Sequence, residues 1–143
     1  MTALRRIVYG ADIAGTGPVV VMIPSLGRGG ADFSMLAKSL REGGFRTISL
    51  TPQVHPADSP QTFEDLADDV LELIGASSAD PVHLVGHAYG QALSRCIAAR
   101  HSAVLRSLVL LACGGSIPDD EIRRSLAAAT TFSTRSVLSE EAA

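Results

Sequence analysis

The clearest chemical pattern in the sequence is a turn bounded by glycines, Gly86-His87-Ala88-Tyr89-Gly90, between an apolar run and a helix-like pattern. Because glycine has no Cβ, Gly86 and Gly90 allow backbone and helix to approach closely on both sides of the middle residue. In a Gly-x-Ser-x-Gly turn, the middle residue is a nucleophilic serine at the N-terminus of a helix, near free N–H groups. Here that residue is Ala88. The turn therefore predicts the frame of a nucleophilic site without its reactive oxygen.

Three polar residues are candidates to line a pocket beside this turn: Ser25, His55 and His87. A serine hydroxyl needs an adjacent base to become a nucleophile, and the sequence places no histidine to serve Ser25. His87 is next to the tip of the turn, where we expect it to pack or hydrogen-bond beneath the backbone. His55 belongs to a proline-rich stretch, 51–60, which we expect to be a loop over the site.

The elements that position these residues alternate between strand and helix patterns. Strands are expected at 6–9, 19–23, 45–50, before the turn, and at 105–111, with helices starting near Asp32, at Thr62, after the turn and at Pro118. The continuous apolar run 19–23 is typical of a strand covered on both faces. This alternation predicts an α/β fold with a largely parallel sheet flanked by helices. The 143 residues fit one domain, 1–143, in which 130–143 has weak periodicity and is expected to fray.

Two helices carry their own start signals. Asp32 is expected to cap a helix whose inner stripe is Phe33, Leu36, Ala37 and Leu40. Thr62, with Asp65 three residues later, forms a near capping box for the next helix. The outer face of that second helix is acidic, and we interpret it as a solvated face, not as a metal site.

Composition excludes several classes of function. A net charge of −3 with 12 Lys and Arg gives no electrostatic basis for binding nucleic acid. The N-terminus lacks the apolar region of a signal peptide, and no apolar run approaches a membrane span. Cys96 and Cys113 fit no zinc or redox spacing, so we expect buried thiols in a cytoplasmic protein without a metal.

These features, in this order, resemble the α/β-hydrolase superfamily over roughly residues 6 to 121. The resemblance rests on the strand and loop 19–30, the helix from Asp32, the glycine-bounded turn and the strand 105–111. It implies acyl-type hydrolysis of a small ester, with no cofactor. The oxyanion would be held by the backbone N–H groups of Leu26 and Tyr89.

The sequence also departs from that family. The His-Gly pair common in the oxyanion loop reads Pro24-Ser25, the nucleophile position holds Ala88, and the pattern stops after the strand usually counted sixth. Asp119 and Asp120 have the position of helix-start residues rather than of a catalytic acid. We therefore expect an inactive hydrolase scaffold, with Ala88 either native or engineered. The alternatives are a non-catalytic module that binds a small ligand and a truncated fragment that needs a partner.

The strand 105–111 raises a question of assembly. In the family that it resembles, this strand is interior, whereas here only the Pro118 helix and a weakly patterned tail follow it. An apolar edge strand is a template for pairing with another chain. We therefore expect self-association through 105–111, or a partner segment that supplies the next strands.

Overall fold

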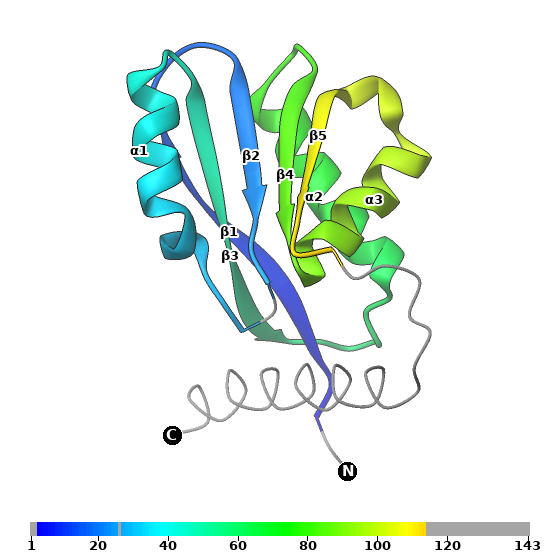
Figure 1. Cartoon of the computed structure of the whole chain (residues 1–143). Coiled ribbons are helices and arrows are strands. Elements are labelled where there is room, and N and C mark those ends of the chain that lie inside the picture. The colour runs from blue at the N-terminus through cyan, green and yellow to red at the C-terminus, as the bar shows by residue number, and fades with distance from the viewer. Residues whose placement is uncertain (1–2, 26, 114–143) are drawn as a thin grey trace.

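A computed structural model describes residues 3–25 and 27–113, and the structural statements below refer to these residues (Figure 1). The elements in chain order are β1 Arg5–Ala14, β2 Val19–Ile23, η1 Gly30–Phe33, α1 Ser34–Glu42, β3 Arg46–Pro56, α2 Phe63–Ser77, β4 Val82–His87, α3 Tyr89–Arg100, η2 Ser102–Val104 and β5 Leu105–Leu111. Leu26, the helix expected from Pro118 and the tail 130–143 lie outside the described residues.

The five strands form one sheet in the order β1-β3-β2-β4-β5. β2 pairs in parallel with β3 and with β4, and β4 pairs in parallel with β5. β1 is antiparallel to β3. The α/β fold with a mostly parallel sheet is therefore confirmed.

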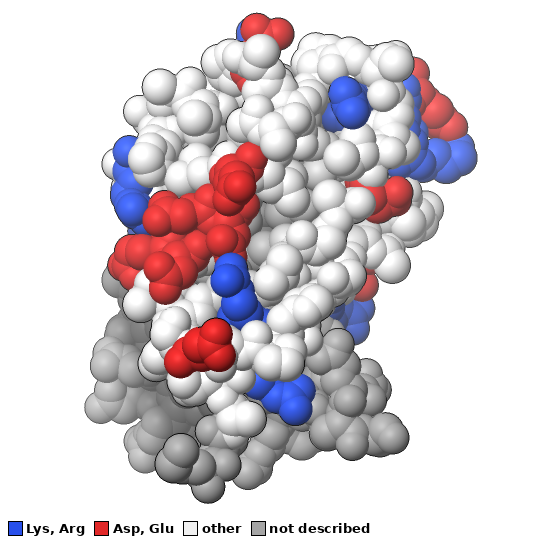
Figure 2. Space-filling view, turned by 180° about the vertical axis from the view of Figure 1, so that it is seen from behind, with Lys and Arg blue, Asp and Glu red and all other residues white. Residues whose placement is uncertain are grey.

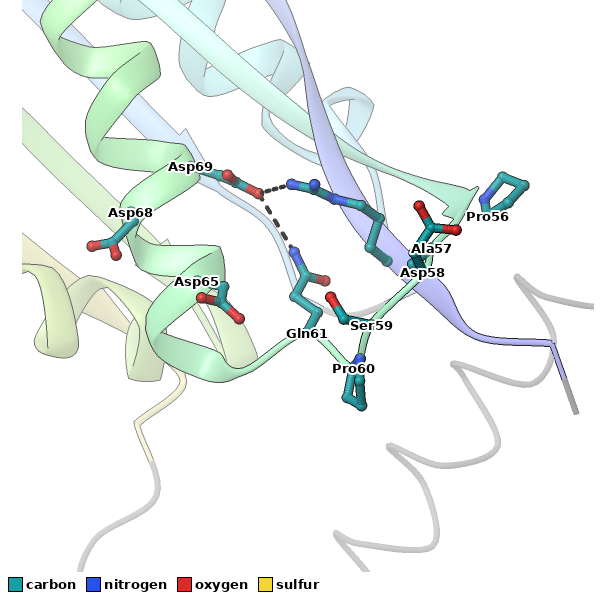
Figure 3. Close-up of a pocket in the computed structure, with 10 residues that line it drawn as sticks. Pro56, Ala57, Asp58, Ser59, Pro60, Gln61, Asp65, Asp68 and Asp69 are labelled. Carbon is teal, nitrogen blue, oxygen red and sulfur yellow. Dashed lines mark hydrogen bonds and ion pairs between the residues drawn. The ribbon is translucent and has the colours of Figure 1, made fainter.

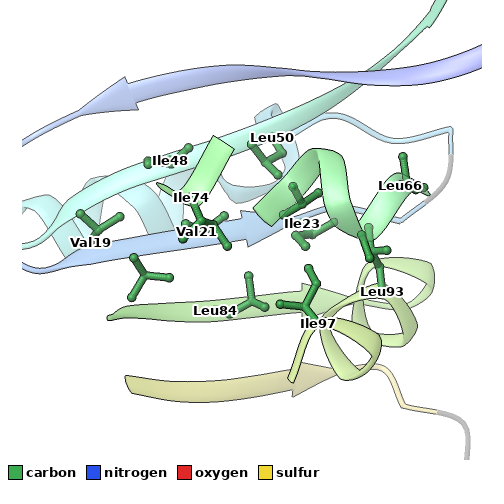
Figure 4. Close-up of a cluster of buried hydrophobic side chains, with 13 residues drawn as sticks. Val19, Val21, Ile23, Ile48, Leu50, Leu66, Ile74, Leu84, Leu93 and Ile97 are labelled. Atoms are coloured by element: carbon green, nitrogen blue, oxygen red, sulfur yellow. The ribbon is translucent and has the colours of Figure 1, made fainter. Parts of the chain in front are cut away.

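Helices cover both faces of the sheet, with α1 on one side and α2 and α3 on the other (Figure 1). On the α2 and α3 side, Val21, Ile23 and Leu84 pack against helix residues that include Ile74, Leu93 and Ile97 (Figure 4). On the α1 side, a smaller core joins Val20, Met22 and Val85 to Phe33 and Ala37. Alternate residues of β2 thus enter opposite cores, which explains the continuous apolar run in the sequence. Burial of each large aliphatic side chain contributes about 1.5–3 kcal/mol.

β3 is longer than the sequence pattern predicts. It continues to Pro56 because β1 pairs with it from Arg5↔Pro56 to Ala14↔Thr47. Beyond Ser49, β3 pairs with β1 alone. A proline there has no N–H, and it can direct its nitrogen to the unpaired side of the strand without losing a ladder hydrogen bond. The expected loop at 51–60 was therefore wrong in its first half, and His55 belongs to a strand.

The start of α1 also differs from the prediction. Asp32 lies in the 3-10 turn η1, and no side-chain hydrogen bond caps α1, which begins at Ser34. Asp32 binds Arg28 instead. Of the predicted inner stripe, Phe33 and Ala37 are buried and Leu40 packs against their cluster, whereas Leu36 is exposed.

Two other sequence predictions have different outcomes. The capping box of α2 is confirmed, since the Asp65 N–H donates to Thr62 Oγ1 at 3.1 Å and the Thr62 N–H donates to Asp65 Oδ2 at 2.8 Å. The expectation of buried thiols was wrong, because Cys96 is only partly covered on α3 and Cys113 is exposed after β5. Among the described helices, none is long and apolar enough to cross a membrane.

Candidate active site at the carboxyl end of the sheet

The four parallel strands β2, β3, β4 and β5 end at the same edge of the sheet (Figure 1). The segments that follow them therefore gather at one end of the molecule. In open α/β sheets, ligands bind outside the carboxyl ends of the strands. The turn at Ala88 follows β4 and lies at this end.

The backbone of Ala88 adopts an unusual conformation, with φ 51° and ψ −111°. A non-glycine residue in such a region costs about 1–3 kcal/mol and persists only where its surroundings hold it. Two hydrogen bonds do so here: the Ala88 N–H donates to Leu111 O at 3.0 Å, and the Gln91 N–H donates to Ala88 O at 3.0 Å. The strained residue is therefore tied to both β5 and α3.

Gly86 and Gly90 make this turn possible. A Cβ on Gly86 would lie 2.7 Å from Gln91 Cα, and a Cβ on Gly90 would lie 2.8 Å from Pro24 O. Both distances are shorter than real Cβ contacts, so only glycine fits. The close approach predicted from the two glycines is confirmed, and it brings the segment before Ser25 against the start of α3.

Tyr89 is the first residue of α3. Backbone N–H groups in the first turn of a helix have no acceptor within the helix, and they carry its positive partial charge. The Tyr89 ring packs edge-on against Phe63 of α2, with ring centroids 5.8 Å apart. Burial raises the pKa of its hydroxyl. The ring is therefore held between α2 and α3, and the N–H lies at the turn.

Several hydrogen bonds hold the segment between β2 and α1 in place. The Arg28 N–H donates to Ser25 O at 3.1 Å, and the Gly30 N–H donates to Thr51 Oγ1 at 2.8 Å. Arg28 also binds both carboxylate oxygens of Asp32, at 2.7 and 2.9 Å. Because Leu26 is outside the described residues, its oxyanion role stays a prediction.

The Arg28–Asp32 pair was missed by sequence reasoning, although opposite charges four residues apart were visible in the sequence. The hydrogen bond from Arg28 holds the pKa of Asp32 below its usual value, and the nearby His87 acts in the same direction. His87 is half-buried at the end of β4.

The other three histidines of the chain belong to other parts of the fold: His55 is on β3, His83 is near the start of β4 and His101 follows α3. His55 is exposed on β3, where it pairs with Arg6 of β1, so the expected loop position over the site was wrong. His83 Nδ1 and Ser107 Oγ are 2.6 Å apart. His101 follows the last residue of α3, at the opposite end of that helix from the turn.

A cavity of about 470 Å³ opens near the same end of the sheet (Figure 3). An ion pair of 2.8 Å joins Arg6 to Asp69 at its wall. Acidic side chains gather on this side of the molecule (Figure 2). The residues that line the cavity are Arg6, Pro56, Ala57, Asp58, Ser59, Pro60, Gln61, Asp65, Asp68 and Asp69. None of them belongs to the turn, and the described residues contain no group of three side chains suited to hold a metal.

Comparison with known proteins identifies relatives of the chain. The sequence model described as "Alpha/beta hydrolase family" matches residues 20–141. The carbendazim hydrolyzing esterase of Nocardioides sp. (strain SG-4G) is 33% identical over 96 residues, which are 64% of this chain and 40% of that protein.

Solved structures show the same fold. A structure in a study of carboxylesterases from the thaumarchaeon Nitrososphaera gargenis has a TM-score of 0.67 at 20% identity, over 73% of this chain and 41% of that one. The epoxide hydrolase VrEH1 from Vigna radiata has a TM-score of 0.69 at 18% identity, over 87% of this chain and 46% of that one. The chain thus spans less than half the length of these proteins. Because an esterase and an epoxide hydrolase share the fold, the fold alone does not select a reaction.

Proposed function

The chain belongs to the alpha/beta hydrolase family, and we propose that its turn at Ala88 forms a site that binds a small ester without cleaving it through a covalent intermediate. The ester class is suggested by the similar esterase from Nocardioides. Loss of covalent cleavage follows from the residue at position 88.

The observation that carries the proposal is the conformation of Ala88. Its strained backbone is held by Leu111, Gln91 and the two glycines, although its methyl group cannot attack a carbonyl carbon. In a nucleophilic turn this geometry presents an oxygen to the substrate and directs backbone N–H groups at the developing oxyanion. With alanine, the binding half of that arrangement is kept and the reacting half is absent.

The Tyr89 N–H is the donor that we assign to the ligand carbonyl oxygen. It lies at the N-terminus of α3, where a partial positive charge favours an electron-rich oxygen. A neutral ester carbonyl is a weaker acceptor than an oxyanion, so we expect reversible and weak binding.

Binding of phenyl acetate, followed by the backbone amide signals of the labelled protein, tests the proposal. We expect saturable shifts at Ala88 and Tyr89, while the amide of Gly75 on α2 stays unchanged. Ala88→Leu fills the tip of the turn and should abolish the shifts. The matched variant Ala99→Leu, on an exposed position of α3, should preserve them. Equal shifts in wild type and Ala88→Leu would refute the proposed site.

A further inference from the structure

The segment that joins β2 to α1 begins against the start of α3 (Figure 1). A Cβ on Gly90 would lie 2.2 Å from Ile23 O and 2.8 Å from Pro24 O, so the two backbones are in direct contact. In open α/β sheets, ligands bind in the crevice between segments of this kind. A shift of the backbone at Ser25 would therefore change the space in which a ligand meets the Tyr89 N–H.

The other end of this segment is held on the sheet. The Gly30 N–H donates to Thr51 Oγ1 of β3 at 2.8 Å, and the Asp32 N–H donates to Gly29 O at 3.1 Å. A Cβ on Gly30 would lie only 3.0 Å from Ser49 Cβ, so η1 packs closely on β3. Asp32 therefore belongs to a part of the segment whose position is set by the sheet.

Arg28 connects the two ends of the segment. Its backbone N–H donates to Ser25 O at 3.1 Å, and its guanidinium binds Asp32 through Nε at 2.7 Å and Nη2 at 2.9 Å. Two parallel contacts to one carboxylate fix the orientation of a guanidinium. The two side chains are 63% and 36% exposed, and an exposed ion pair contributes little to the stability of a fold. Its main effect is therefore on the position of the Arg28 backbone.

We propose that Arg28 and Asp32 are positioning residues for the ligand site. Their ion pair holds the backbone of Arg28, whose N–H in turn holds Ser25 beside the start of α3. This inference rests on the proposed function, because it concerns the affinity of that site for an ester. A segment that is ordered before the ligand arrives loses little conformational freedom on binding. Loss of the ion pair should therefore weaken binding and leave the fold intact.

Amide hydrogen exchange of the ligand-free protein tests the first step. Asp32→Asn keeps the size of the side chain and removes its charge, so the Arg28 amide should exchange about threefold faster or more. Glu42→Gln is the matched control, because it breaks another exposed ion pair between residues four apart, Lys38–Glu42 of α1. We expect the control to leave the Arg28 amide unchanged. An Arg28 amide that exchanges equally in wild type and Asp32→Asn would overturn the proposal.

Titration with phenyl acetate, followed at the Ala88 and Tyr89 amide signals, tests the second step. Arg28→Gln and Asp32→Asn should each raise the Kd by about threefold, whereas urea denaturation should show nearly unchanged stability. The double variant should bind as each single variant does, since all three lack the same ion pair. Glu42→Gln should keep the wild-type Kd. Multiplied effects in the double variant would overturn the proposal, because the two residues would then act separately.

The proposed function and this inference fail in different ways. If the wild-type protein gives no saturable shifts with phenyl acetate, the proposed function is wrong and the effect on affinity falls with it. If the wild type binds and Asp32→Asn binds with the same Kd, the site stands and the positioning role of Arg28 and Asp32 is wrong.

Discussion

The backbone N–H of Ala88 donates a hydrogen bond of 3.0 Å to the carbonyl oxygen of Leu111. This bond joins the tip of the turn after β4 to the last residue of β5. The most strained residue of the candidate site is thus anchored to the carboxyl end of β5. A substitution that displaces the carboxyl end of β5 should therefore change the backbone conformation at Ala88.

Replacement of Ala88 by glycine tests the strain at the turn. Glycine adopts a positive φ without the steric cost that alanine carries, although it adds entropy to the unfolded chain. We expect Ala88→Gly to leave the free energy of unfolding unchanged or raised by up to about 1 kcal/mol. Ala92→Gly, inside α3, should lower it by about 1 kcal/mol. Urea denaturation of both variants measures the difference, and equal losses would mean that Ala88 is not strained.

Gly90 should not tolerate a methyl group. In Gly90→Ala the new Cβ would collide with the backbone of Ile23 and Pro24, which cannot rotate away as a side chain can. We expect a loss of about 3 kcal/mol or more, or failure to fold. Gly75→Ala is the matched control, since that position in α2 has open space around it and should gain about 0.5–1 kcal/mol. Thermal melting compares the two, and a stable Gly90→Ala protein would contradict the packing of the turn.

The capping box of α2 should contribute to stability in a pH-dependent way. Thr62→Ala removes the side chain that accepts from the Asp65 N–H and should cost about 1 kcal/mol at neutral pH. Hydrogen bonds from the Thr62 backbone and side chain lower the pKa of Asp65 in the folded state. The ionised carboxylate therefore stabilises the fold fully above the unfolded pKa of aspartate, about 3.9. That contribution is lost as the pH falls through the lower folded pKa.

Asp65→Asn isolates this contribution. It should destabilise the protein at neutral pH, and the difference from wild type should shrink as the pH falls through the lowered pKa of Asp65. Urea denaturation from about pH 7 to about pH 2 follows the change. A difference that is constant over this range would mean that the charge of Asp65 has no part in the cap.

Restoring a hydroxyl at the turn should not restore a nucleophile. Ala88→Ser adds one oxygen, which needs a base, and three of the four histidines of the chain are placed on β3, beside Ser107 or at the far end of α3. His87 is next to Ala88 in sequence and is half-buried at the end of β4, and no hydrogen bond in the described residues orients its ring as a base. We expect no labelling of Ala88→Ser by a fluorophosphonate probe. Stoichiometric labelling that disappears in the double variant with His87→Ala would identify His87 as an unforeseen base.

The predictions from sequence that the structure confirms are those that depend on local features of the chain. The two glycines around Ala88 predicted a close approach, and alternating strand and helix patterns predicted the parallel sheet. Thr62 and Asp65 predicted a helix start because their hydrogen bonds are local.

Sequence reasoning failed where partners distant in the chain decide the structure. The strand at His55 exists because β1 pairs with it, and β1 lies more than forty residues earlier. The failure at Asp32 is of another kind, because its partner is local: Arg28, four residues earlier, binds the carboxylate, and Asp32 caps no helix.

The most direct test of the account is to measure the rate at which 4-nitrophenolate is released when the wild-type protein is mixed with excess 4-nitrophenyl acetate. We predict a rate no higher than that of the heat-denatured protein and no initial burst, because Ala88 provides no oxygen to accept the acetyl group. A burst of one phenolate per chain, followed by steady turnover, would contradict the account. It would show that another residue forms the covalent intermediate at this site.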